Sequence, residues 1–168
     1  QTGWTTDELM HGIEAADPPG TWVLVSLLIG VNNQYRGRSL GNFEAEFRQL
    51  AETAIGLSHE GAQRVQALSI PDWGQTPFGA GCGRDRRQIS LEIDAFNDCA
   101  KTVCTSLNIA FLDITALTRR HSIETGMHAE DGLHPSAQMH HLWAKALLFT
   151  KKFGRLGLRA REKDNNHE

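Results

Sequence analysis

The segment Asp131-Gly-Leu-His134-Pro135 contains the residues of this chain that are best suited to acid–base chemistry. A carboxylate three residues before an imidazole can hold the ring in one tautomer and stabilise its cation. The other ring nitrogen can then take a proton from a nucleophile. Pro135 stiffens the segment, and a helical pattern follows it. Asp131 and His134 are therefore predicted to form the general-base half of a serine hydrolase.

The elements that must position this pair alternate along the chain. Thr5, followed three residues later by Glu8, forms a capping-box pattern that predicts the start of a helix over residues 5–16. Apolar residues at helical spacing predict helices over residues 43–57, 89–107 and 139–147. Apolar runs without polar alternation predict buried strands over residues 21–29, 64–70 and 109–114. The segments 31–41 and 71–88 are interpreted as loops. This order predicts parallel strands joined by right-handed crossovers, so the expected fold class is α/β, a three-layer α/β/α domain.

Two further residues are predicted to lie at the same edge of the sheet as the Asp–His pair, because ligands bind beyond the carboxyl ends of parallel strands. Asn32 directly follows the first strand, where its side-chain amide can donate to an oxyanion. Gly3 precedes the first helix, and its backbone N–H can face the same pocket. Donors and an acid–base pair are parts that acyl transfer needs, but no convincing nucleophile appears among the 168 residues.

The motifs together resemble the SGNH (GDSL-type) hydrolase family, whose blocks contribute Ser, Gly, Asn and His. Thr2-Gly3-Trp4 resembles the Gly block, Gly30-Val31-Asn32 the Gly-x-Asn block, and Asp131-Gly-Leu-His134 the final Asp-x-x-His block. The resemblance implies a flavodoxin-like fold and an esterase, lipase or acylhydrolase activity on a small-molecule ester, without a cofactor or metal. It also implies that Asp131 and His134 are triad members and that Asn32 and Gly3 form the oxyanion hole.

The chain departs from the family pattern at the block that carries the nucleophile. Gly-Asp-Ser occurs nowhere in the sequence, and the Gly block already stands at residue 3. We therefore expect that one or more N-terminal strands are missing, that the serine lies upstream of Gln1, and that the chain alone is inactive. Because the family places its first strand centrally, residues 21–29 are expected to expose a long apolar edge.

Two alternative functions remain open. The first is a non-catalytic binding or interaction module, or an inactive fragment of the same fold. The second is a thiol enzyme that uses Cys82 together with His134, although nothing in the sequence indicates a lowered thiol pKa at Cys82. Cys99 and Cys104 are interpreted as packing residues.

Other residues at the ligand edge have ambiguous roles. Trp73, Phe78 and Tyr35 can line a substrate pocket, or they can anchor their segments to the core. Arg84, Arg86 and Arg87 are interpreted as a solvated cluster. Five of the eight histidines fall between residues 121 and 141, but no zinc-binding motif is present, so no metal site is predicted.

Composition excludes several classes of protein. A net charge of −3 gives no basic field for nucleic acid, and the longest apolar run, residues 22–29, is too short to span a bilayer. Three cysteines without a CxxC motif favour a reducing compartment, so a cytoplasmic location is expected. The length fits one domain, predicted over residues 1–153, and a charged tail over 154–168 that is expected to be disordered. No sequence feature specifies an oligomeric state.

Overall fold

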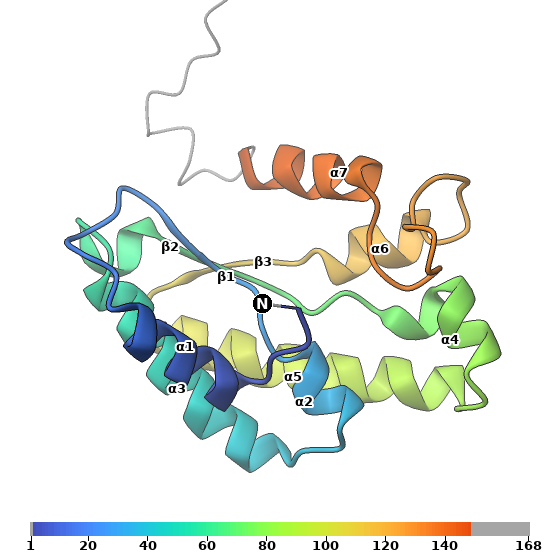
Figure 1. Cartoon of the computed structure of the whole chain (residues 1–168), viewed down its shortest axis with the longest axis horizontal. Helices are drawn as coiled ribbons and strands as arrows, with labels where there is room; N and C mark the ends of the chain where they lie inside the picture. Colours follow the sequence, from blue (N-terminus) through green and yellow to red (C-terminus); the bar gives the residue numbers. More distant parts are fainter. Residues whose placement is uncertain (1, 149–168) are drawn as a thin grey trace, which may run out of the picture.

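The computed structural model describes residues 2–148 (Figure 1). The predicted tail over residues 154–168 lies outside the described residues. The elements follow in the order α1 (Thr6–Ala16), β1 (Val25–Leu27), α2 (Val31–Tyr35), α3 (Leu40–Gly56), η1 (Gly61–Arg64), β2 (Val65–Leu68), η2 (Trp73–Gln75), α4 (Pro77–Gly81), α5 (Arg86–Ser106), β3 (Ala110–Leu112), α6 (Thr115–His121) and α7 (Ala137–Leu148).

The three strands form a parallel sheet in the order β1-β2-β3, which confirms the predicted parallel strands alternating with helices. Val25 lies opposite Val65, and Gln66 lies opposite Ala110. All three strands are shorter than predicted from the apolar runs. The run over 21–29 pairs as a strand only at its centre, with one further isolated bridge from Trp22 to Ser58.

Helices cover both faces of the sheet, as the three-layer prediction requires. In Figure 1, α1, α3 and α5 lie on one side of the strands and α7 lies on the other. The larger core cluster packs α3 and α5 against the sheet and includes Phe43, Phe47, Val65, Ile89 and Ile93, all almost fully buried. A smaller cluster under α7 consists of Ile114, Met127, Met139 and Trp143.

The α1 helix begins one residue from its predicted start, whereas α3 and α5 begin at Leu40 and Arg86, three residues before the predicted starts. The backbone N–H of Thr5 donates to the Glu8 carboxylate at 2.8 Å, which is half of the predicted capping box. The α1 helix ends at Asp17, which adopts a left-handed conformation with φ of 40°. The starts of α3 and α5 are capped by the side chains of Ser39 and Asp85, which accept hydrogen bonds from Asn42 and Arg87.

The prediction that 31–41 and 71–88 are loops was wrong in part. Residues 31–35 form α2, η2 and α4 lie within 71–88, and α6 follows β3, where no helix is predicted. These elements have three to seven residues and are too short to show a helical apolar repeat. The α2 helix starts from Gly30, which has a φ of +118° and where a Cβ atom would lie only 2.7 Å from the Phe43 ring, so a side chain is excluded.

The expected exposure of an apolar edge at β1 is confirmed. Among residues 2–148, β1 pairs only with β2, so its other edge is open. Large apolar side chains beside that edge are exposed: Trp22 (51%), Val23 (69%), Leu24 and Leu28. An exposed apolar strand edge is a template for pairing with another segment.

A buried ionic network joins η2 to α5 and α6. The carboxylate of Asp72, which is fully buried, accepts hydrogen bonds from Ser90 Oγ at 2.6 Å and from Arg119 Nε at 2.8 Å. Its other oxygen accepts from the Gly74 N–H at 3.0 Å. The same guanidinium also pairs with Asp94 at 2.9 Å, but Asp94 is half exposed. Arg119 therefore has one buried and one solvated carboxylate partner.

We expect Asp72→Asn to lower the free energy of unfolding by about 2 kcal/mol, because an amide cannot accept from all three donors and loses the charge that Arg119 faces. Asp94→Asn is the matched control, since it removes the same charge from the same arginine at an exposed position, and its cost should stay below about 1 kcal/mol. Urea denaturation measures both values. Equal destabilisation by the two variants would contradict this account.

Candidate active site

Asp131 and His134 occupy a short hairpin between α6 and α7. His128 and Pro135 form an antiparallel bridge, and the Ala129 N–H donates to the His134 carbonyl at 2.8 Å. At the tip, one Asp131 oxygen accepts the backbone N–H groups of Leu133 and His134, both at 2.9 Å. This turn is local, because each bond spans two or three residues. The turn therefore orients the carboxylate by bonds within the hairpin and needs no contact with other parts of the fold.

The second oxygen of Asp131 lies 2.6 Å from His134 Nδ1. An ionised carboxylate can only accept, so Nδ1 carries the proton and donates it. In the neutral ring Nε2 is then an unprotonated acceptor. Both side chains are about half exposed, and His134 lines a cavity. The pair therefore has the tautomer that a general base requires.

The hydrogen bond from His134 and the backbone N–H groups of Leu133 and His134 lower the pKa of Asp131 to about 2. The carboxyl of an aspartate in an unfolded chain has a pKa of about 3.9. The stabilisation is therefore present above that value and lost as the pH falls towards 2.

We expect Asp131 to stay ionised at pH 3. Carboxyl ¹³C NMR should show its midpoint near 2, and His134→Ala should raise that midpoint, because the imidazole hydrogen bond is the largest cause of the shift. Leu133→Ala keeps both backbone donors and is the matched control. A midpoint that His134→Ala leaves unchanged would contradict this origin of the shift.

The cavity beside His134 has a volume of about 310 Å³ and is also lined by Gly3 and Asn32. The structure thus brings three of the four predicted catalytic residues to one cavity, with Asp131 immediately behind His134. Gly3 and Asn32 are each more than 100 positions from His134 in the sequence. Apolar side chains form much of the remaining wall: Leu28, Ile29, Val31, Ile70, Pro71, Pro135 and Trp143.

Asn32 lies in the first turn of α2, five residues beyond Leu27, where β1 ends. Its side-chain amide donates one hydrogen bond to the Trp4 carbonyl at 3.1 Å. An amide nitrogen carries two donors, so one N–H remains for another acceptor. Asn32 is therefore held by the N-terminal segment and keeps the capacity to donate into the cavity.

Gly3 is fixed against α2 by its carbonyl. Arg36 donates to that oxygen at 2.8 Å and also pairs with Glu8 at 3.1 Å. Gly3 has a φ of +91°, a conformation that residues with a side chain rarely adopt. A residue with a side chain would therefore be strained at position 3.

The predicted aromatic residues lie together but do not line this cavity. Tyr35 contacts Trp73 edge-on, with ring centroids 5.3 Å apart, and Phe78 lies 6.3 Å from the same ring. Trp73 is buried, and its indole N–H donates to Gln34 at 2.7 Å. Tyr35 and Phe78 are partly exposed. Their role as a substrate pocket stays a prediction, and the geometry observed is that of an aromatic cluster beside the site.

Sequence reasoning missed several contributors to the site. His140 and Trp143 line the cavity from α7, with ring centroids 5.1 Å apart. The buried Met139–Trp143 face of that helix was the available signal, since His140 lies beside it. The tether from Arg36 to Gly3 had no such signal, because the two residues are 33 positions apart.

Side chains that could act as a nucleophile are scarce at this cavity. Thr2 carries the one hydroxyl group in the described lining, and no serine or cysteine belongs to it. Cys82 does not line the cavity, and its thiol contacts the Gly79 carbonyl at 3.3 Å. Burial raises the pKa of Cys104 to about 12. Within residues 2–148, no three or more His, Cys, Asp or Glu side chains are grouped to hold a metal ion.

A parallel α/β sheet with a tautomer-locked Asp–His pair and amide donors at its carboxyl edge is the arrangement of hydrolases that act through an activated nucleophile. The chain belongs to the GDSL-like lipase/acylhydrolase family, whose model matches residues 1–142. This family comprises SGNH-type ester hydrolases. None of the curated proteins matches the sequence.

Solved structures show the same fold at low sequence identity. Axe2, an acetylxylan esterase from Geobacillus stearothermophilus, superposes with a TM-score of 0.66 at 22% identity, over 90% of this chain and 68% of that one. A lipase/acylhydrolase from Enterococcus faecalis gives 0.62 at 21% identity, over 91% and 72%. LAE5, an alpha/beta hydrolase from the metagenome of Lake Arreo, gives 0.64 at 16% identity, over 92% and 70%. No helix within residues 2–148 has the length and apolarity to cross a membrane.

Proposed function

We propose that this chain carries the general base and the oxyanion donors of a serine ester hydrolase, and that the nucleophilic serine lies N-terminal to Gln1. The observation that carries the proposal is the 2.6 Å hydrogen bond from His134 Nδ1 to Asp131, at a cavity that His134 shares with Gly3 and Asn32. Family membership supports ester hydrolysis.

In the proposed reaction, His134 Nε2 takes the proton of the serine hydroxyl as its oxygen bonds to the acyl carbon. The carbonyl oxygen becomes an oxyanion, to which Asn32 Nδ2 and the Gly3 N–H donate. His134 then gives the proton to the leaving alcohol as the ester C–O bond breaks. Water, deprotonated by the same nitrogen, cleaves the acyl-enzyme to the acid and restores the serine. Asp131 stabilises the imidazolium in both steps.

Two observations support a nucleophile from an additional segment. The described cavity lining contains no serine, although its other parts suit acyl transfer. The edge of β1 is open and flanked by exposed apolar side chains, of which Leu28 also lines the cavity. A strand added at this edge would end beside Asn32, because the carboxyl ends of parallel strands meet at one edge.

The substrate class that we propose is a carboxylic ester of a small molecule. The cavity combines apolar walls with a few polar groups, which is typical of small-molecule sites. Axe2 acts on acetylxylan, and its fold is similar to that of this chain, so an ester of a carbohydrate is one candidate substrate within this class.

A fluorophosphonate probe tests the position of the nucleophile. We expect mass spectrometry of the labelled full-length protein to place the adduct on a serine N-terminal to Gln1, and we expect the 168-residue chain to remain unlabelled and not to hydrolyse p-nitrophenyl acetate. Thr2→Ala and Cys82→Ala are the internal controls. Labelling of the 168-residue chain that either variant abolishes would refute the proposal.

A non-catalytic binding module is the second candidate, favoured by the absence of a serine from the described lining. The same experiment separates the two functions. A full-length protein that binds an ester at this cavity, but neither reacts with the probe nor turns the ester over, would establish the binding module instead.

A further inference from the structure

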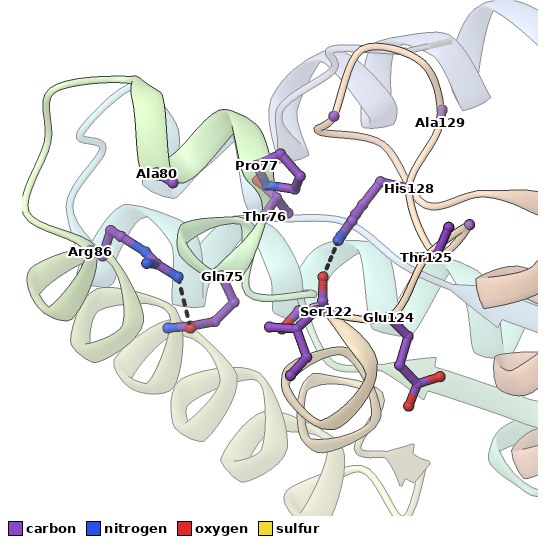
Figure 2. A pocket seen from close by; sticks show the side chains of 13 residues that line it. Gln75, Thr76, Pro77, Ala80, Arg86, Ser122, Glu124, Thr125, His128 and Ala129 are labelled. Atoms are coloured by element: carbon purple, nitrogen blue, oxygen red, sulfur yellow. Dashed lines mark hydrogen bonds between the residues drawn. The ribbon is translucent and has the colours of Figure 1, made fainter.

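A second cavity, of about 500 Å³, lies outside the Asp131–His134 site. It opens between η2 and α4 on one side and the segment after α6 on the other, as Figure 2 shows. The volume is in the range of sites that hold small molecules. No step of the proposed ester hydrolysis uses this cavity.

One wall of the cavity presents an oriented positive charge. Arg86 Nε donates to the Gly74 carbonyl at 2.7 Å, and Nη2 donates to the side-chain oxygen of Gln75 at 3.2 Å. Both acceptors are neutral, and no carboxylate of residues 2–148 pairs with this guanidinium. Arg84, by contrast, is paired with Glu92 at 3.2 Å. The charge of Arg86 is therefore held in place without being neutralised.

The opposite wall does not supply the missing negative charge. Glu124 accepts a hydrogen bond from His121 at 2.7 Å, and Figure 2 shows its carboxylate directed away from Arg86. His128 Nε2 donates to the Ser122 carbonyl at 2.9 Å. The hydroxyl of Thr125 makes no hydrogen bond within the described part of the chain. The cavity thus offers donors and lacks an acceptor of matching charge.

We propose that this cavity binds a small organic acid whose carboxylate pairs with Arg86. The planar guanidinium matches a carboxylate with two parallel hydrogen bonds, and Nη1 is free to contribute. Pro77, Ala80 and Ile123 also line the cavity and give the carbon skeleton apolar contacts. These contacts favour an organic acid over an inorganic anion.

The lining extends to Ala129 and Gly132, which belong to the hairpin that carries the Asp–His pair. The Phe78 N–H donates to the Gly132 carbonyl at 3.0 Å, so α4 and this hairpin are joined at the edge of the cavity. Backbone amides of the hairpin therefore report on occupancy of the cavity, independently of any ester turnover.

Benzoate, added to the ¹⁵N-labelled full-length protein, tests the proposal. We expect saturable shifts of the amide signals of Gly126, Ala129 and Gly132. Benzamide has the same size without the charge, and inorganic phosphate has charge without a carbon skeleton. Each should bind at least about tenfold more weakly, as the loss of a charged hydrogen-bond pair or of apolar contact implies. Equal binding of benzamide or phosphate, or the absence of saturable shifts, overturns the proposal.

Two matched variants test whether benzoate binding depends on the charge of Arg86. Arg86→Gln should weaken benzoate binding at least about tenfold. Arg87→Gln removes the same charge from the next residue of α5, which does not line the cavity, and should leave the affinity within about twofold. Equal effects of the two variants would show non-specific attraction and overturn the proposal. If Arg86→Gln does not fold, the comparison of benzoate with benzamide on the unmodified protein decides the outcome.

Discussion

Replacement of His134 by alanine is expected to lower kcat for ester hydrolysis by the full-length protein about 10⁴-fold. In the proposed mechanism, the variant loses the acceptor that takes the serine proton and the acid that protonates the leaving alcohol. Little stability should be lost, because the side chain is half exposed and Asp131, which it contacts through Nδ1, is also about half exposed. Hydrolysis of p-nitrophenyl acetate measures the rate, and thermal unfolding measures the stability.

The control for this variant is His141→Ala, which removes an exposed imidazole of α7 that does not line the cavity. We expect its kcat to equal that of the unmodified protein within about twofold. A His134→Ala protein that remains folded and retains more than about a tenth of the original kcat would contradict the assignment of His134 as the general base.

Replacement of Asn32 by alanine is expected to lower kcat by about 10²–10³-fold, equivalent to about 2.7–4 kcal/mol of transition-state stabilisation. An oxyanion donor acts mainly after the carbonyl oxygen has gained charge, so KM should change little. Steady-state kinetics with p-nitrophenyl acetate separates the two parameters. The isosteric Asn32→Asp should lose at least as much activity, because it places a negative charge where the oxyanion forms.

Asn32 also donates to the Trp4 carbonyl, so a purely structural role must give a different result. Loss of that tether alone would lower the melting temperature, and it would affect Asn32→Ala and Asn32→Asp similarly, since both remove the amide donor. A rise in KM with unchanged kcat, or a loss of activity that follows the loss of folded protein, would contradict a role in the oxyanion hole.

The parts of this protein that could be predicted from the sequence are those that depend on neighbouring residues. The Asp131–His134 pair needs only a turn of four residues, which the backbone donors of Leu133 and His134 close. The long helices α3 and α5 each bury one apolar face, which gives a repeat over several turns. The short helices α2, α4 and α6 could not be predicted in this way, because one or two turns contain no repeat.

The sequence by itself determined the alternating elements, the Asp–His pair and the edge of the sheet at which Asn32 and Asp131 lie, since these follow from local periodicity and from the direction of parallel strands. Only the tertiary structure decided which side chains share a cavity. It brought His140 and Trp143 to the side of His134, turned Tyr35, Trp73 and Phe78 towards one another, and paired Asp72 with Arg119. These contacts join residues whose separation in the chain carries no periodic signal, so they depend on how the helices pack on the sheet.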